Sequence, residues 1–282
     1  MSIFDNLQLL WAQLWKPQDK AVEITICPER NYIFDILEEG KKKNSIHLLG
    51  EAKIGRIKHK EHLSSQKSQD ASLTCQIIQI FSQILNEHPE MHAYLKGRRQ
   101  RVIFQNVDLA CMVERELADG SLQPLHYIIR DCEKKNLSEL QHELNKARNA
   151  PIGNGGPLTS LEMWFMTWPR WCRKLIWLWI KYDPYTSKQL IGTAGVTSMG
   201  MHSQNGMLVI PISPLTITLS IGGVEKRRGT SSSEEHDDYY LKFALTANHD
   251  VIDGAPLMRF AEKLKNKIES QLNGSDQHAE RQ

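Results

Sequence analysis

The sequence lacks any cysteine pattern that would define a disulfide framework or a zinc site. Its five cysteines are scattered along 282 residues, and no two of them form a Cys-x-x-Cys pair. We therefore expect neither disulfide bonds nor a bound metal, and reduced thiols in a cytoplasmic protein are the simplest interpretation. These residues are Cys27, Cys75, Cys111, Cys132 and Cys172.

Long apolar runs and a strong charge of one sign are also missing. No stretch reaches the roughly 18 uncharged apolar residues that a membrane-spanning helix needs. The formal net charge is only +2, so we expect no polyanionic partner such as a nucleic acid. The first residues do not form a signal peptide, because Asp5 interrupts them and no cationic region precedes the apolar residues. The expected location is therefore the cytoplasm.

Tryptophan, by contrast, is concentrated in two segments. Residues 3–15 place apolar side chains at helical spacing, which predicts an amphipathic helical segment within residues 1–24. The second segment, residues 158–182, holds all of the other tryptophans among arginines and lysines. Two interpretations stay open. The two segments pack on each other or on a neighbouring subunit, or they make a peripheral contact with a membrane interface, where tryptophan and long cationic side chains are favoured.

Helical and alternating patterns of apolar residues follow one another through the rest of the chain. Helical spacing predicts helices over residues 31–40, 72–87, 137–148 and 256–270. Alternation predicts strands over residues 45–58, 125–129 and 240–245, a strand pair over 101–114 and a strand-rich stretch over 208–223 that is broken at Pro211 and Pro214. We read Lys41 to Asn44 as a solvated turn. We expect one domain over residues 25–271, which includes the Trp-rich segment, and a disordered tail over 272–282.

The motif with the clearest chemical content is His249, followed four residues later by Asp253 and then by Gly254. It lies between a strand-like run and a helix-like segment, so the histidine is expected near a strand end. An imidazole there can act as a general base if another group fixes its tautomer and ring orientation. Gly254 allows the backbone to turn where a side chain would clash. The motif is short, however, and a histidine at a strand end is more often structural than catalytic.

Three motifs taken in order are more specific than the histidine motif alone. They are residues 192–200 (GTAGVTSMG), residues 210–225 (from Ile-Pro to Gly-Gly-Val-Glu) and residues 248–256 (NHDVIDGAP). This order resembles the catalytic domain of the acyltransferase (E2) components of 2-oxoacid dehydrogenase complexes, which shares its fold with chloramphenicol acetyltransferase. Weaker similarity extends the resemblance over roughly residues 25–270.

The resemblance implies an α/β fold, a large mixed β-sheet flanked by helices. It also implies a homotrimer with active sites at the subunit interfaces, and a larger assembly of trimers stays open. The implied reaction moves an acyl group between a coenzyme A thioester, which is a substrate, and a thiol or hydroxyl acceptor. That acceptor is a small molecule or is attached to a carrier.

The resemblance also implies roles for individual residues. His249 matches the family's catalytic base. Asp253 matches a carboxylate that pairs with an early arginine and holds the histidine loop, and Arg30 is the candidate for that arginine. Thr197 falls where the family has a hydroxyl that donates to the tetrahedral oxyanion. Ser198 is the alternative if the register is shifted by one residue.

Two departures from the family pattern leave other functions open. Asn248-His249-Asp250 stands where the family usually has Asp-His-Arg, so an acid replaces an arginine. In addition, no lipoyl domain is expected before the core, so the chain brings no lipoyl group of its own. The alternative is therefore a non-catalytic trimeric assembly or a membrane-associated protein that retains the fold. A third hypothesis is a core that works with a separately encoded lipoyl protein.

Overall fold

The computed structural model describes residues 30–55, 73–97, 99–116, 122–150, 160–198, 206–228 and 237–273. The amphipathic segment predicted within residues 1–24 and nearly all of the predicted tail, residues 274–282, lie outside these ranges. Within them, no helix is both long enough and apolar enough to cross a membrane.

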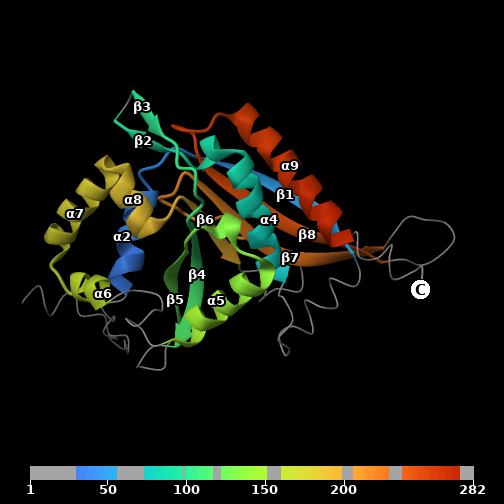
Figure 1. The fold of residues 1–282 in the computed structure, drawn as a ribbon, viewed down its shortest axis with the longest axis horizontal. Helices are drawn as coiled ribbons and strands as arrows, with labels where there is room; N and C mark the ends of the chain where they lie inside the picture. Colours follow the sequence, from blue (N-terminus) through green and yellow to red (C-terminus); the bar gives the residue numbers. More distant parts are fainter. Residues whose placement is uncertain are drawn as a thin grey trace, which may run out of the picture.

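A six-stranded mixed sheet forms the centre of the fold, with the strand order β1-β8-β7-β6-β4-β5 (Figure 1). Its strands are β1 (Ser45–Ile54), β4 (Leu109–Glu116), β5 (Leu122–Ile129), β6 (Ala194–Ser198), β7 (Ile217–Arg228) and β8 (Asp237–Asn248). The short strand β6 runs parallel to β4 and β7, and the other neighbouring pairs are antiparallel. The mixed sheet confirms the predicted fold class.

The strand pair predicted over residues 101–114 is wrong. Its two halves belong to different sheets, because β3 (Gln100–Val102) pairs with β2 (Tyr94–Lys96), whereas β4 pairs with β5 and β6. The apolar alternation identified both strands but not their partners, because pairing depends on contacts that are distant in sequence.

Three helices cover one face of the sheet (Figure 1). They are α4 (Leu73–Glu87), α5 (Leu137–Asn149) and α9 (Gly254–Asn273). Their apolar faces and the inner face of the sheet form the main core, in which the rings of Phe81 and Phe260 meet edge to face at 6.1 Å. All three helices were predicted from their spacing. The capping box of Asn136 and Glu139 fixes the start of α5.

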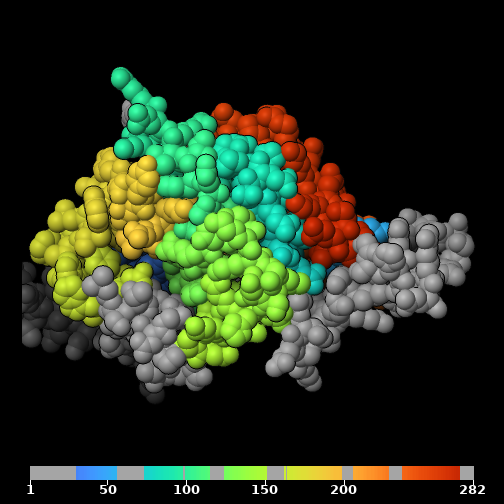
Figure 2. Space-filling model, in the orientation of Figure 1, coloured from blue at the N-terminus to red at the C-terminus, as the bar shows by residue number. Residues whose placement is uncertain are grey.

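A second group of helices lies at the far end of the sheet, around β4 and β5 (Figures 1 and 2). It contains α2 (Arg30–Gly40), α6 (Ser160–Met166), α7 (Arg170–Tyr182) and α8 (Pro184–Ile191). The Trp-rich segment is therefore helical, as α6 and α7. A buried ion pair fastens it to α2: Arg173 Nε donates to Asp35 Oδ2 at 2.8 Å, and both side chains are only 6% exposed.

Removing Asp35 should destabilise this end of the fold strongly, because it leaves the buried Arg173 guanidinium without its counter-charge. We expect Asp35→Ala to lower the free energy of unfolding by about 3–5 kcal/mol, measured by urea denaturation. Glu38→Ala is the matched control one helical turn later, where the partners Arg170 and Lys174 are exposed. It should cost less than about 1 kcal/mol. Equal losses in the two variants would contradict this assignment.

The stretch predicted as strand-rich over residues 208–223 is only partly so. Strand β7 starts at Ile217, and residues 206–213 have no regular secondary structure. Pro211 and Pro214 each lack a backbone N–H and so interrupt a hydrogen-bonded ladder. The segment instead lies against β7, where Gly223 N–H donates to the carbonyl of Met207 at 2.9 Å.

Candidate active site

The loop that carries His249 starts where β8 ends and is held by the first residues of β1. The backbone N–H of His249 donates to the carbonyl of Asn44 at 2.7 Å. Asn44 Nδ2 donates to Asp250 Oδ1 at 2.9 Å, and the side chain of the buried Asn248 accepts from the Asp250 N–H at 3.3 Å. Asp250, which departs from the usual family pattern, therefore fastens the loop to the turn before β1.

The His249 imidazole is open on the surface of the chain. Its side chain is 48% exposed, and Nδ1 lies 3.8 Å from Asp253 Oδ1. No group in the described part of the chain bonds to Nε2, so this nitrogen is available to an incoming molecule. Asp253 is itself 77% exposed and is therefore screened by water, which weakens its effect on the ring.

The predicted support from Arg30 and Gly254 is not visible within one chain. Arg30 begins α2, and its guanidinium lies 5.9 Å from the centre of the Phe34 ring. Among the described residues it forms no ion pair with Asp253. Gly254 is the first residue of α9, and a Cβ added there would meet nothing within 4 Å. Sterics within the chain therefore do not require glycine at this position.

Thr197 lies far from His249 in the same chain. It pairs with Ser220 of β7, which pairs with Ala244 of β8, and His249 comes five residues after Ala244. Standard strand spacing and rise put the two side chains roughly 15–20 Å apart. One chain alone therefore does not bring the predicted base and the predicted oxyanion donor together.

Thr197 and Ser198 point to opposite faces of the sheet, as neighbours on a strand must. Ser198 Oγ lies 3.3 Å from Thr74 Oγ1, so it faces the helix layer through α4. Thr197 is on the other face, beside Ser220. The two alternatives left by the sequence thus lie on different faces, and only Thr197 is on the face away from the α4, α5 and α9 layer.

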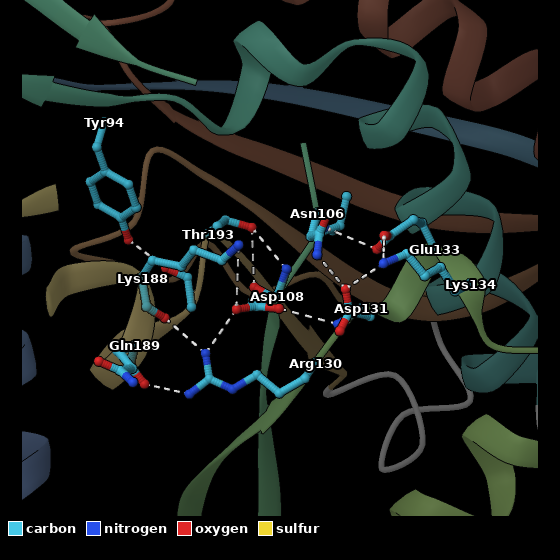
Figure 3. Close-up of polar contacts among 12 residues, drawn as sticks. Tyr94, Asn106, Asp108, Arg130, Asp131, Glu133, Lys134, Lys188, Gln189 and Thr193 are labelled. Atoms are coloured by element: carbon cyan, nitrogen blue, oxygen red, sulfur yellow. Dashed lines mark hydrogen bonds and ion pairs between the residues drawn. The ribbon is translucent and has the colours of Figure 1, made fainter. Parts of the chain in front are cut away.

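A polar network holds the start of β6, the strand that carries Thr197 (Figure 3). The carboxylate of the buried Asp108 accepts from Arg130 Nη1 at 2.8 Å and from the Asp131 N–H at 3.1 Å. Its backbone carbonyl accepts from the Thr193 N–H at 2.7 Å. Gly192, at φ +84°, is required here because a Cβ would meet that carbonyl oxygen at 2.7 Å.

A cavity of about 710 Å³ borders the His249 loop. The chain neighbours of His249 line one side of it, and the end of α2, the strand β2 and the helices α7 and α8 line the rest. Its polar and aromatic lining includes Lys42, Lys43, Tyr94, Trp177, Lys181, Tyr182, Asn248 and Asp250. Within the described ranges, no cluster of three or more His, Cys, Asp or Glu side chains could hold a metal ion.

Comparison with solved structures identifies the fold. The catalytic domain of dihydrolipoamide acetyltransferase from Azotobacter vinelandii aligns with a TM-score of 0.64 at 14% identity, over 89% of this chain and 92% of that one. A probable dihydrolipoamide acetyltransferase from Listeria monocytogenes gives 0.62 at 17% identity, over 90% and 96%. The catalytic core of a 2-oxoacid dehydrogenase complex from Thermoplasma acidophilum gives 0.61 at 19%, over 89% and 98%.

This chain has the fold of the E2 acyltransferase cores. The fold predicted from the three ordered motifs is therefore confirmed. No family model and no curated protein matches the sequence. Because the identities are below 20%, the likeness establishes the architecture, and residue roles must be argued from the geometry.

Sequence reasoning missed two parts of the site on this acyltransferase fold. Asp108 is buried directly before β4, and a lone acid at a strand start gave no signal for the network it forms. Lys43 was read as part of a solvated turn, but it lines the cavity. A run of lysines next to a turn gives no sign of which side chain faces inward, because that depends on the packing of α7 beside it.

Proposed function

We propose that this protein is a coenzyme A-dependent acyltransferase that moves an acyl group between a coenzyme A thioester and a thiol or hydroxyl acceptor. One observation carries the proposal. The imidazole of His249 sits on an anchored loop at a strand end, with Nδ1 toward Asp253 and Nε2 free of partners in the described chain. The E2 acyltransferase fold supports it.

The acyl transfer reaction begins at the free Nε2 of His249. This nitrogen takes the proton from the acceptor S–H or O–H as the sulfur or oxygen attacks the thioester carbonyl. The carbonyl oxygen becomes an oxyanion, to which the Thr197 hydroxyl donates. When the tetrahedral intermediate collapses, the carbon–sulfur bond to coenzyme A breaks, and the imidazolium returns the proton to the leaving thiolate. No acyl-enzyme forms.

A second copy of the chain is part of the proposal. Because one chain separates Thr197 from His249, the complete site combines the threonine of one subunit with the histidine of its neighbour. The homotrimer implied by the sequence resemblance would satisfy this requirement. Exposed apolar residues on the sheet face away from α4 support an interface: Leu49, Met207, Val209, Ile210 and Ile212 are each at least 45% exposed.

The direct test is an acyl transfer assay on the purified full chain. Acetyl-CoA and longer acyl-CoA esters would be incubated with thiol acceptors, including dihydrolipoamide and a lipoyl protein, and with hydroxyl acceptors. We expect acceptor-dependent release of free coenzyme A. Absence of turnover with every pair, together with no coenzyme A binding by calorimetry, would favour the non-catalytic assembly. Turnover only with the lipoyl protein would favour a core that works with a separate lipoyl carrier.

Contact with a membrane surface is a second candidate function, favoured by the outer face of α7. Five large side chains spaced three, four or one residues apart form one exposed stripe on this helix. They are Trp171, Leu175, Leu178, Trp179 and Tyr182, each at least 50% exposed. Arg170 and Lys174 lie beside the stripe. Aromatic and cationic residues on one helix face suit the interface of an anionic membrane.

Removing the two exposed indoles tests this contact. We expect the double variant Trp171→Ala, Trp179→Ala to lower the partition coefficient onto anionic liposomes by at least about tenfold, measured by flotation, because two large apolar side chains no longer enter the interface. Met258→Ala is the control, since Met258 is 54% exposed on α9, away from the stripe. If the wild-type protein does not float, or the double variant floats equally well, the stripe does not bind membranes.

A further inference from the structure

The cavity beside the His249 loop has an unusual charge arrangement. Lys43, which is half-buried, and the exposed Lys181 both line it, and neither has an acid within ion-pair distance among the described residues. The other lysine of the turn that lines it, Lys42, is paired with Glu39. Two ammonium groups in one cavity are therefore left without a counter-charge.

Glu39 and Asp250 also line this cavity, but among the described residues neither lies within ion-pair distance of Lys43 or Lys181. Glu39 is engaged by Lys42, and Asp250 Oδ1 accepts from Asn44 at 2.9 Å. Burial lowers the pKa of Lys43, and the charge of Lys181 lowers it further, against the weaker opposing effects of Asp250 and Glu39. The two ammonium groups are thus close enough to repel each other, and an anion between them would relieve that repulsion.

The Trp177 side chain forms part of the cavity wall. Trp177 is only 6% exposed, and its indole N–H meets no acceptor among the described residues. Because this nitrogen is closed off from the cavity, the two lysines are the donors that an anion in the cavity can reach. Lys181 and Trp177 both come from α7.

We propose that this cavity binds the acyl acceptor through an anionic group, a carboxylate or a phosphate, that pairs with Lys43 and Lys181. This inference rests on the proposed acyl transfer, because it names the acceptor class for the same site. The cavity volume suits a small molecule. Its lining includes Asn248 and Asp250, on either side of His249, so the uncharged end of the acceptor would extend toward the base.

The test compares matched thiol acceptors in acetyl transfer from acetyl-CoA. The probes are 3-mercaptopropionate, a thiol carrying a phosphate monoester, and the neutral 3-mercaptopropionamide. We expect kcat/KM for at least one anionic thiol to exceed that for the neutral thiol by at least about tenfold. A single charge-assisted contact with a lysine is strong enough to give a difference of that size. The double variant Lys43→Met, Lys181→Met should bring the ratio close to one and leave the KM for acetyl-CoA unchanged. Lys41→Met, in the same turn but outside the cavity lining, should keep the wild-type ratio.

Calorimetric titration with the two anionic thiols, without acetyl-CoA, separates this inference from the proposed function. Binding lost in the Lys43, Lys181 double variant supports the anion site even if no acyl transfer occurs. Acyl transfer with equal efficiency to charged and neutral thiols overturns the anion site and leaves the transferase intact. A raised KM for acetyl-CoA in the double variant also overturns it, because the lysines would then serve the phosphates of coenzyme A. If neither anionic thiol binds, the anion site is also overturned.

Discussion

Replacing His249 with alanine is expected to lower kcat for acyl transfer by about 10²–10⁴-fold, because the acceptor then loses its general base. The expected cause is chemical, since the exposed imidazole contributes little packing to the fold. The backbone contact of His249 with Asn44 is retained in the variant, so the loop should keep its position.

The measurement is steady-state release of coenzyme A with a saturating thiol acceptor. His142→Ala is the matched control, because His142 is exposed on α5 in the helix layer on the other face of the sheet. It should keep wild-type rates, and both variants should unfold at the same urea concentration as the wild type. Unchanged turnover in His249→Ala would remove this histidine from the mechanism.

Replacing Thr197 with valine should lower kcat by about 10²–10³-fold with little change in KM, because valine keeps the branched shape but cannot donate to the oxyanion. Ser198→Ala is the control at the neighbouring position. Ser198 faces Thr74 in the helix layer, so its loss should leave the rate within a few-fold of wild type. The opposite outcome, with Ser198 essential and Thr197 dispensable, would shift the assigned register by one residue.

Mixing the two inactive variants tests whether the site is shared between subunits. Co-expressed Thr197→Val and His249→Ala chains can form sites in which both groups are intact, one from each copy. Random assembly in a closed ring gives such sites at about one quarter of the interfaces, so about one quarter of wild-type activity should return. If the mixture stays inactive although mixed oligomers are isolated, the two groups do not meet across an interface.

The local elements of this protein follow from patterns within short windows of sequence. The apolar face of α4 depends on residues three or four positions apart, and the alternation in β8 depends on residues two positions apart. Both elements appear where they were predicted. The place of His249 directly after a strand and shortly before a helix was predictable for the same reason. The fold itself was predicted from the resemblance that the three ordered motifs carry.

Contacts between distant segments were not predictable in this way. The pairing of β4 with β5 and β6 rather than with β3 is one example. The pairing proposed for Arg30 and Asp253 was carried over from the family, and within one chain Arg30 lies over Phe34 instead.

The sequence by itself determined the α/β class, the main helices and strands, and the place of His249 at a strand end. Only the tertiary structure showed that Thr197 and His249 lie apart in one chain, and that Lys43, Trp177 and Lys181 face one cavity. The physical reason is the range of the interactions involved. Helical and strand periodicity is set by the backbone geometry of neighbouring residues, whereas a cavity is set by the packing of segments more than a hundred residues apart.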